Sequence, residues 1–306
     1  MKVVQIGLGV WGEKNASIFS DLGILSAVCD SNTQKLKGSI KKKSVNHYES
    51  TDNLIASEHF DGAFVDTAVS NCVDTITKLI SEKKHVFVKK STMFDLTEVE
   101  KLIEMSLKKK VIFTCGFDGR FNQTVKQVKK FVREKKYGDL TLLEFYCKSK
   151  KVPQNQRGIV FESSINDIDS SNWIFDEMPV VVFARLDSNS EKENFASIML
   201  GYKDNKTAII LSNGLLSKEK RNLRAICSKA VVCSDLISQE IKVENEDAQV
   251  LPKEDSVLLQ VQNFIGAMQG KNEIAVKTNE IVNVTKVAEA ALLSGKQGVP
   301  IYLDLK

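Results

Sequence analysis

The run KVVQIGLGVWG, residues 2–12, decides how this chain begins to fold. A strand-like apolar segment leads directly into Gly7, Gly9 and Gly12, spaced as GxGxxG, and a helix-like segment follows. In such a turn the first glycine permits the tight bend, the second lets a phosphate approach the backbone, and the third allows close helix–strand packing. The N-terminus of the helix then faces the anion. The run therefore predicts a strand–turn–helix unit that binds a dinucleotide.

A carboxylate stands where such a unit needs one. The second strand-like run, ILSAVCD, ends in Asp30. Asp30 follows the middle glycine by about 20 residues, the offset of the carboxylate that binds the ribose hydroxyls of a dinucleotide. A carboxylate repels a 2′-phosphate, so NAD is favoured over NADP, although Lys35 and Lys37 nearby keep NADP open. The alternative is an ordinary tight turn in which Asp30 caps a helix.

The chain changes character after about residue 120. Before that point strand-like and helix-like segments alternate, which predicts a doubly wound parallel sheet of Rossmann type over residues 1–119. After it, long strand-like runs follow one another with few helices between them, which predicts a mixed, mostly antiparallel open sheet over residues 120–306. We expect the first domain to bind the nucleotide and the second to bind substrate and to mediate oligomerisation.

Composition excludes several classes of protein. A net charge of +4 over 306 residues is too small for a dedicated nucleic-acid binder, and the basic run 126–136 is typical of the solvated face of a helix. None of the six cysteines forms a CxxC pair, so neither a metal site nor a disulfide framework is expected. The sequence has no signal-peptide pattern and no run long enough to span a bilayer, so we expect a cytoplasmic protein with no membrane partner.

Two segments carry candidate chemistry. In HVFVKKS, residues 85–91, Lys89 and Lys90 lie at the end of a buried strand, where open parallel sheets bind ligands, and a lysine there can exchange a proton with a reacting alcohol. A solvated strand end is the alternative. In the segment 158–175, Glu162, Asn166 and Asp169 share one helical face, which is either a site wall or an exposed surface.

The chain resembles the Gfo/Idh/MocA oxidoreductases along its whole length. The blocks that carry the resemblance are IGLGVWG, VDTAVSNC, KKHVFVKKSTMFDLTEVEKL, CGFDGRFN and ESSINDID, in this order. The resemblance implies that Lys90 is the catalytic lysine and that Lys89 replaces a glutamate. It also implies that Ser91 replaces a proline, and that Cys72 replaces a histidine of the cofactor loop.

The last of these blocks departs from the family in its charged residues. Glu162 falls on the position of a family aspartate, which is a mild change, and Asn166 falls on that of the catalytic histidine. Asparagine forms hydrogen bonds but does not titrate near neutral pH. The implied catalytic residues are therefore Lys90, Glu162 and Asn166.

The resemblance also implies the binding residues. Those for the cofactor are Gly7, Gly9, Val10, Trp11, Gly12, Asp30, Ser31, Thr67, Ala68 and Lys90. Those for the substrate are Lys90, Arg120, Asn166 and Asp169.

The expected reaction moves a hydride between nicotinamide and a sugar carbon. We expect Lys90 to act as the acid or base, Glu162 to set its protonation, and Asn166 to orient the substrate hydroxyl. Lys89 adds a like charge that would depress the pKa of Lys90 if both lie near the site. The second half resembles nucleotide-sugar dehydrogenases that act on UDP-N-acetylglucosamine at C3. There, Arg221 and Arg224 are either diphosphate ligands or exposed strand charges.

Two other functions remain open at this point. The changes at Lys89, Ser91, Glu162 and Asn166 favour a sensor or assembly protein that binds NAD without turnover. A DNA-binding regulator that uses 126–136 lacks a recognisable motif. A homodimer or homotetramer formed through the second sheet is implied by the resemblance.

Overall fold

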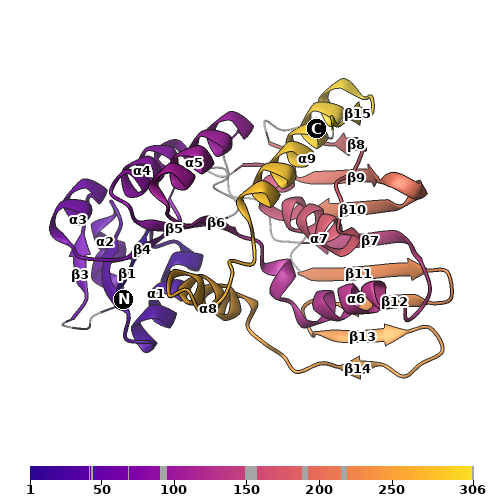
Figure 1. The fold of residues 1–306 in the computed structure, drawn as a ribbon, viewed down its shortest axis with the longest axis horizontal. Helices are drawn as coiled ribbons and strands as arrows, with labels where there is room; N and C mark the ends of the chain where they lie inside the picture. The colour runs from indigo at the N-terminus through magenta and orange to yellow at the C-terminus, as the bar shows by residue number, and fades with distance from the viewer. Residues whose placement is uncertain are drawn as a thin grey trace. The chain divides into compact units, whose positions relative to one another are not determined.

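The computed structural model describes residues 1–40, 42, 44–67, 69–89, 95–148, 157–187, 192–214 and 219–304 (Figure 1). The chain forms two compact units. The first consists of Met1–Gly116 with Gln260–Val282, and the second of Phe117–Leu259 with Asn283–Lys306. The predicted fold class is confirmed, because the first unit holds a parallel sheet and the second a mixed, mostly antiparallel one.

Six parallel strands form the sheet of the first unit, in the order β3-β2-β1-β4-β5-β6. Their bounds are β1 Val3–Ile6, β2 Leu25–Cys29, β3 Asn46–Tyr48, β4 Gly62–Val65, β5 His85–Lys89 and β6 Phe113–Gly116. The chain moves outward in one direction from β1 to β3 and then returns to start again at β4. The order therefore reverses between β1 and β4, and the carboxyl ends of strands at such a switch point form the usual binding crevice.

Helices connect these strands. They are α1 Val10–Asp21, α2 Thr33–Gly38, α3 Thr51–Ser57, α4 Val69–Ser81 and α5 Leu96–Lys109. Asp95 caps α5, since its side chain accepts a hydrogen bond from the Glu98 N–H at 2.9 Å. Helix α5 ends at its C-cap residue, Lys110, whose backbone adopts the left-handed conformation.

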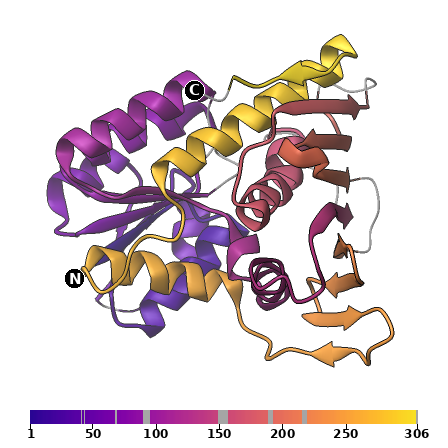
Figure 2. The ribbon, with the colours of Figure 1, turned by 45° about the vertical axis from the view of Figure 1, so that its right-hand side comes forward.

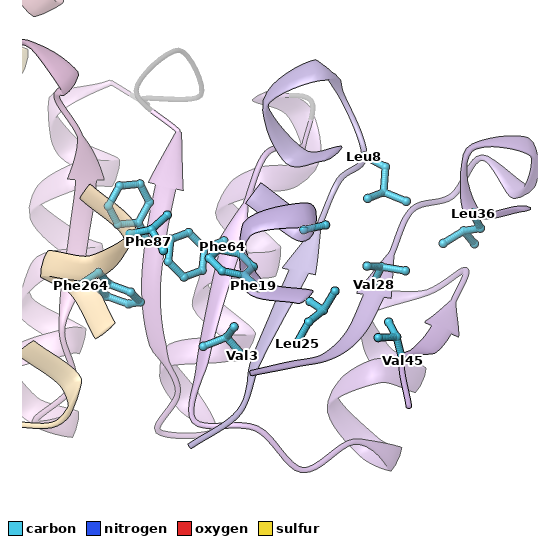
Figure 3. Packing of buried hydrophobic residues seen from close by; sticks show 12 residues of the cluster. Val3, Leu8, Phe19, Leu25, Val28, Leu36, Val45, Phe64, Phe87 and Phe264 are labelled. Atoms are coloured by element: carbon cyan, nitrogen blue, oxygen red, sulfur yellow. The ribbon is translucent and has the colours of Figure 1, made fainter. Parts of the chain in front are cut away.

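The core of the first unit includes a helix from the far end of the chain. Phe264, on α8 Ser256–Met268, packs edge-on against Phe64 and Phe87 with ring centroids 5.1 and 5.5 Å apart (Figure 3). Phe19 of α1 completes the aromatic cluster, 4.4 Å from Phe64. Because of this packing, residues 260–282 belong to the first unit. The predicted division at residue 119/120 assigned that segment to the second domain.

Nine strands form the sheet of the second unit, in the order β14-β13-β12-β11-β7-β10-β9-β8-β15. Only β7 and β10 run parallel, and every other neighbouring pair is antiparallel. The strands are β7 Leu140–Lys148, β8 Val181–Leu186, β9 Phe195–Gly201, β10 Thr207–Asn213, β11 Lys220–Cys227, β12 Val231–Asp235, β13 Glu240–Val243, β14 Gln249–Val250 and β15 Ile301–Tyr302. Strands β11 and β12 pair with each other as an antiparallel hairpin.

Helices cover one face of this second sheet (Figure 2). They are α6 Gln123–Arg133, α7 Ile165–Phe175 and the later part of α9 Thr278–Gln297. The covered face carries buried side chains such as Phe145 and Ile210, whereas Tyr146, Met199 and Leu211 on the opposite face are exposed. Among the described residues, no helix is both long and apolar enough to span a membrane.

Candidate functional site

The glycine turn between β1 and α1 brings the backbone unusually close to the end of β4. Gly7 has a φ of +86°, and a Cβ atom placed on it would lie 2.0 Å from the carbonyl oxygen of Asp66. A Cβ on Gly12 would lie 2.1 Å from the carbonyl oxygen of Gly7. Only glycine fits at these two places. Gly9 precedes the first helical residue and supplies no side-chain cap, so the first N–H groups of α1 have no acceptor within the helix.

Asp30 is held beside this turn. One of its carboxylate oxygens accepts the Leu8 N–H at 2.7 Å and the other accepts the Asn32 N–H at 2.8 Å. Lys35 lies 3.8 Å from the same carboxylate. The end of β2 thus presents a fixed negative group, and each oxygen retains a lone pair for a further donor. Contact between Asp30, or the adjacent Ser31, and a ribose stays a prediction.

The other predicted cofactor residues of the first unit take different environments. Val10 is 91% exposed at the start of α1, and the ring of Trp11 stacks on Phe87 with centroids 6.0 Å apart. The buried Thr67 hydroxyl has no hydrogen-bond partner among the described residues. Ala68 and Lys90 lie outside the described residues.

These features fit a dinucleotide. Two glycines that no other residue can replace form a cradle, and the first turn of α1 offers N–H groups to an anion. The hydroxyl that follows β4 has no hydrogen-bond partner within the described ranges. Gly7, Gly9 and Gly12 would hold the pyrophosphate, and Asp30 the ribose. When bound, the nicotinamide of such a cofactor supplies a hydride acceptor or donor.

One pair near the glycine turn was missing from the sequence analysis. The Lys89 ammonium lies 3.3 Å from a carboxylate oxygen of Asp66. Lys89 therefore pairs with an acid, which sequence alone did not reveal. The available signal was the position of Asp66, which follows β4 directly, just as Asp30 follows β2. Burial raises the pKa of the Asp66 carboxyl, and the Lys89 charge partly opposes that rise.

In the second unit, the predicted polar residues lie on and before α7. Glu162 is in a π-helical turn, Val160–Ser164, and Asn166 and Asp169 follow on the helix. Single π-turns occur frequently at functional sites. Asn166 is 1% exposed, and neither its amide oxygen nor its amide nitrogen has a hydrogen-bond partner among the described residues. A buried unpaired polar group costs about 1–3 kcal/mol, so this amide calls for an explanation.

Arg120 and Asp169, both predicted to bind substrate, bind each other. The Arg120 guanidinium donates to both carboxylate oxygens of Asp169, at 2.8 and 2.7 Å, and both side chains are almost fully buried. The pair fastens the short 3-10 helix Asp118–Phe121 to α7. Direct contact of either residue with a substrate stays a prediction.

A second, partly buried cation reaches the same helix. Arg221 of β11 donates to Asp167 at 3.0 Å and lies 3.8 Å from Asp118. Burial opposes its charge, but Asp167 and Asp118 more than offset that effect and hold the pKa of Arg221 above its usual value. Arg224 instead lies on the open face of the sheet, where it donates to Glu144 at 2.6 Å. The exposed-strand interpretation therefore fits Arg224, and Arg221 anchors α7.

The structure thus sorts the predicted site residues into two groups. The first surrounds the carboxyl ends of β1, β2 and β4. The second lies on the 3-10 helix Asp118–Phe121, the π-turn and the start of α7, where Asp167 and Asp169, which follow Asn166, bind Arg221 and Arg120. Asp66, Asp118 and Asp167 are functional candidates that the sequence analysis did not name.

Comparison with protein families concerns the first unit. Residues 1–117 match the family model GFO_IDH_MocA, described as an oxidoreductase family with an NAD-binding Rossmann fold. A curated relative, the myo-inositol 2-dehydrogenase of Thermotoga maritima, is 28% identical over 192 residues. That match covers 60% of this chain and 58% of the relative.

Solved structures share the fold along the whole chain. UDP-N-acetylglucosamine 3-dehydrogenase GnnA from Acidithiobacillus ferrooxidans aligns with a TM-score of 0.86 at 17% identity, covering 97% of this chain and 98% of that one. An oxidoreductase from Agrobacterium radiobacter, solved with NAD+, L-tartaric acid and magnesium, aligns with a TM-score of 0.85 at 17% identity, covering 99% and 98%.

Proposed function

We propose that this chain, which belongs to the Gfo/Idh/MocA oxidoreductase family, transfers a hydride between NAD and a hydroxyl-bearing carbon of a sugar or nucleotide sugar. The observation that carries the proposal is the glycine cradle, in which Gly7 and Gly12 leave room for no side chain beside the N-terminus of α1. Asp30, fixed at the end of β2, supports NAD over NADP because its charge repels a 2′-phosphate.

In this proposal the proton is handled by side chains of the chain itself. Lys90, which follows Lys89 directly in the sequence, takes the hydroxyl proton as the hydride leaves the same carbon. Glu162 sets the protonation of Lys90. Asn166 binds the substrate hydroxyl through its amide, which supplies both a donor and an acceptor. Among the described residues that buried amide has no hydrogen-bond partner, which supports this role, since a substrate hydroxyl would supply one.

The proposed substrate is a UDP-sugar oxidised at C3, of the UDP-N-acetylglucosamine type. Support comes from the fold shared with GnnA, and the relative from Thermotoga maritima makes inositol the next compound to try. The engagement of Arg221 with Asp167 and Asp118 gives diphosphate recognition no support from that residue. We include a cytoplasmic location in the proposal, because six free cysteines fit a reducing compartment.

Reduced-cofactor absorbance tests the reaction. The protein would be incubated with NAD or NADP and with UDP-N-acetylglucosamine, related UDP-sugars and myo-inositol in turn. Lys90→Ala should abolish turnover while NAD affinity, measured by calorimetry, stays nearly unchanged. Full turnover in Lys90→Ala would contradict the proton role, and absence of dinucleotide binding by the unmodified protein would contradict the whole proposal.

A second candidate is an NAD-binding sensor or assembly protein without turnover. Asn166 favours it, because an amide cannot titrate where the family has a histidine. The same panel separates the two functions. NAD binding with no reduction on any substrate would support the sensor.

The proposed assembly is a homodimer or homotetramer formed through the open face of the second sheet. Tyr146, Met199 and Leu211 project from neighbouring strands on that face, with exposed fractions of 38, 44 and 36%. Apolar side chains gathered on one uncovered face are typical of protein–protein contacts.

A further inference from the structure

Two charged residues meet at the carboxyl edge of the first sheet. Asp66 directly follows strand β4, and Lys89 is the last residue of the neighbouring parallel strand β5. Val65 of β4 and Val88 of β5 are register partners. The Lys89 ammonium lies 3.3 Å from one oxygen of Asp66, with only 21% and 9% of the two side chains exposed. The pair therefore sits in a partly desolvated position.

The second oxygen of Asp66 points at the glycine turn. It accepts the Gly12 N–H at 3.2 Å and lies 3.0 Å from the place where a Cβ on Gly9 would stand. The first turn of α1 attracts anions, since its N–H groups and the helix dipole carry partial positive charge. The Asp66 carboxylate thus already occupies part of the electropositive region that a pyrophosphate would use.

We propose that Asp66 and Lys89 form a counter-charge pair that sets the affinity of the glycine turn for the dinucleotide. In this pair Asp66 weakens the binding of the anionic pyrophosphate and Lys89 restores it. The inference rests on the dinucleotide binding of the proposed function and adds two residues that determine its strength. Neither residue is required to touch the reacting atoms.

The signs of the two effects follow from Coulomb's law. A negative group beside the pyrophosphate repels it, and a positive group attracts it, most strongly where solvent is partly excluded. Asp66→Asn removes the repulsion, keeps an oxygen for the Gly12 N–H and retains the positive charge of Lys89. NAD should then bind about three- to tenfold more tightly. Lys89→Met keeps the aliphatic stem, leaves Asp66 uncompensated and should weaken NAD binding by about the same factor.

A purely structural ion pair gives a different result. If the pair served only to hold β4 and β5 together, removing either partner would loosen the turn, and both variants would bind NAD more weakly. Opposite shifts are therefore the signature of the proposal. The double variant Asp66→Asn/Lys89→Met, which is neutral at both positions, should return close to the affinity of the unmodified protein.

Calorimetric titration of NAD into the full chain tests this inference. The set comprises the unmodified protein, Asp66→Asn, Lys89→Met, the double variant and Lys89→Arg, which keeps the charge and should bind as the unmodified protein does. Glu104→Gln and Lys108→Met make the same charge changes on the exposed surface of α5 and should leave the affinity unchanged. The shifts should shrink at high salt, because screening weakens charge effects.

Three outcomes are decisive. Opposite shifts in Asp66→Asn and Lys89→Met, with recovery in the double variant, support the inference. Shifts in the same direction, or no shift in either, overturn it while NAD binding by the unmodified protein leaves the proposed function standing. If the unmodified protein binds no dinucleotide, the proposed function and the inference fail together. If Lys89→Met does not fold, the NAD affinities of Asp66→Asn and Lys89→Arg still test the inference. Asp66→Asn should bind NAD more tightly than the unmodified protein, and Lys89→Arg should bind it equally well.

Discussion

The Arg120 guanidinium donates two hydrogen bonds, of 2.8 and 2.7 Å, to the Asp169 carboxylate, and both side chains are almost fully buried. The two residues are far apart in the sequence, and their contact joins the 3-10 helix Asp118–Phe121 to α7. Transferring such a pair from water into the protein interior costs free energy. Removing one partner destabilises the protein further, because the other charge then remains buried without an opposite charge.

Arg120→Met should therefore destabilise the protein by about 3–5 kcal/mol. The double variant Arg120→Met/Asp169→Leu should recover much of that loss, since no unpaired charge is left. Urea unfolding measures both, and Lys108→Met, on an exposed helical pair, serves as the control with no measurable change. If the double variant is as unstable as Arg120→Met, the loss of stability does not come from the unpaired charge of Asp169.

The buried amide of Asn166 should lower the stability of the protein although turnover requires it. This buried amide has no hydrogen-bond partner in the part of the chain that the structure describes. Replacing it with leucine removes the desolvation penalty, so Asn166→Leu should be unchanged or more stable by about 1 kcal/mol. Turnover on the sugar panel should be lost, because no group then orients the hydroxyl. Asn166→His should instead retain turnover and make it depend on pH between about 5 and 8. A large loss of stability in Asn166→Leu would show that the amide is paired in the native protein.

Gly12 should not tolerate a methyl group. A Cβ at this position would lie 2.1 Å from the carbonyl oxygen of Gly7, which is backbone and cannot turn aside. Gly12→Ala should lower the free energy of unfolding by about 1–3 kcal/mol and weaken NAD binding. The matched control is Gly38→Ala at the end of α2, where nothing lies within 4 Å of the new atom. Equal behaviour of the two variants in thermal unfolding would contradict the close approach.

His85 should make the protein sensitive to mild acid. Its Nδ1 accepts the Ile112 N–H at 3.0 Å, which a protonated nitrogen cannot do, and burial lowers the pKa of this imidazole. A base with a lowered pKa in the folded state favours folding above its unfolded pKa, about 6.5. That contribution is lost as the pH falls from this value toward the folded pKa.

Unfolding in urea at several pH values between about 7.5 and 5 tests this, since the window brackets the unfolded pKa of histidine. His85→Asn places an amide oxygen where Nδ1 accepts, so its stability should fall less than that of the unmodified protein as the pH drops. His47→Asn, on the exposed strand β3, should follow the unmodified protein. Parallel pH curves for the unmodified protein and His85→Asn would exclude the effect.

Met199 should lie at a contact between copies of the chain. Met199→Glu places a charge on the open face that also carries Tyr146 and Leu211, and burying that charge in an interface is unfavourable. The molar mass from light scattering should fall from that of a dimer or tetramer to that of a monomer. Leu107→Glu, at a position on α5 that is 64% exposed, is the control. An unchanged mass for Met199→Glu would place the contact elsewhere.

Local patterns predicted the elements well, for identifiable reasons. The GxGxxG turn and the alternation of strands and helices each depend on residues a few positions apart, where backbone sterics and hydrogen bonds act directly. The same reasoning named Gly7, Gly12 and Asp30 at the ends of β1 and β2. It also placed Asn166 and Asp169 on one helix, which α7 confirms.

The partners of the charged residues could not be predicted in this way. We expected Lys89 to place a like charge beside Lys90. The structure shows that Lys89 pairs with Asp66, 23 positions earlier, because β4 and β5 lie side by side in register. Arg221 was weighed as a diphosphate ligand and instead anchors Asp167 across the second unit.

The sequence by itself determined the two sheets, the glycine turn and the place of Asn166 and Asp169 on one helix, because these depend on spacing and side-chain chemistry. Only the tertiary structure decided which charges neutralise each other and that residues 260–282 pack with the first unit. Those outcomes depend on strand order and on long-range packing, which bring together residues that no local period relates.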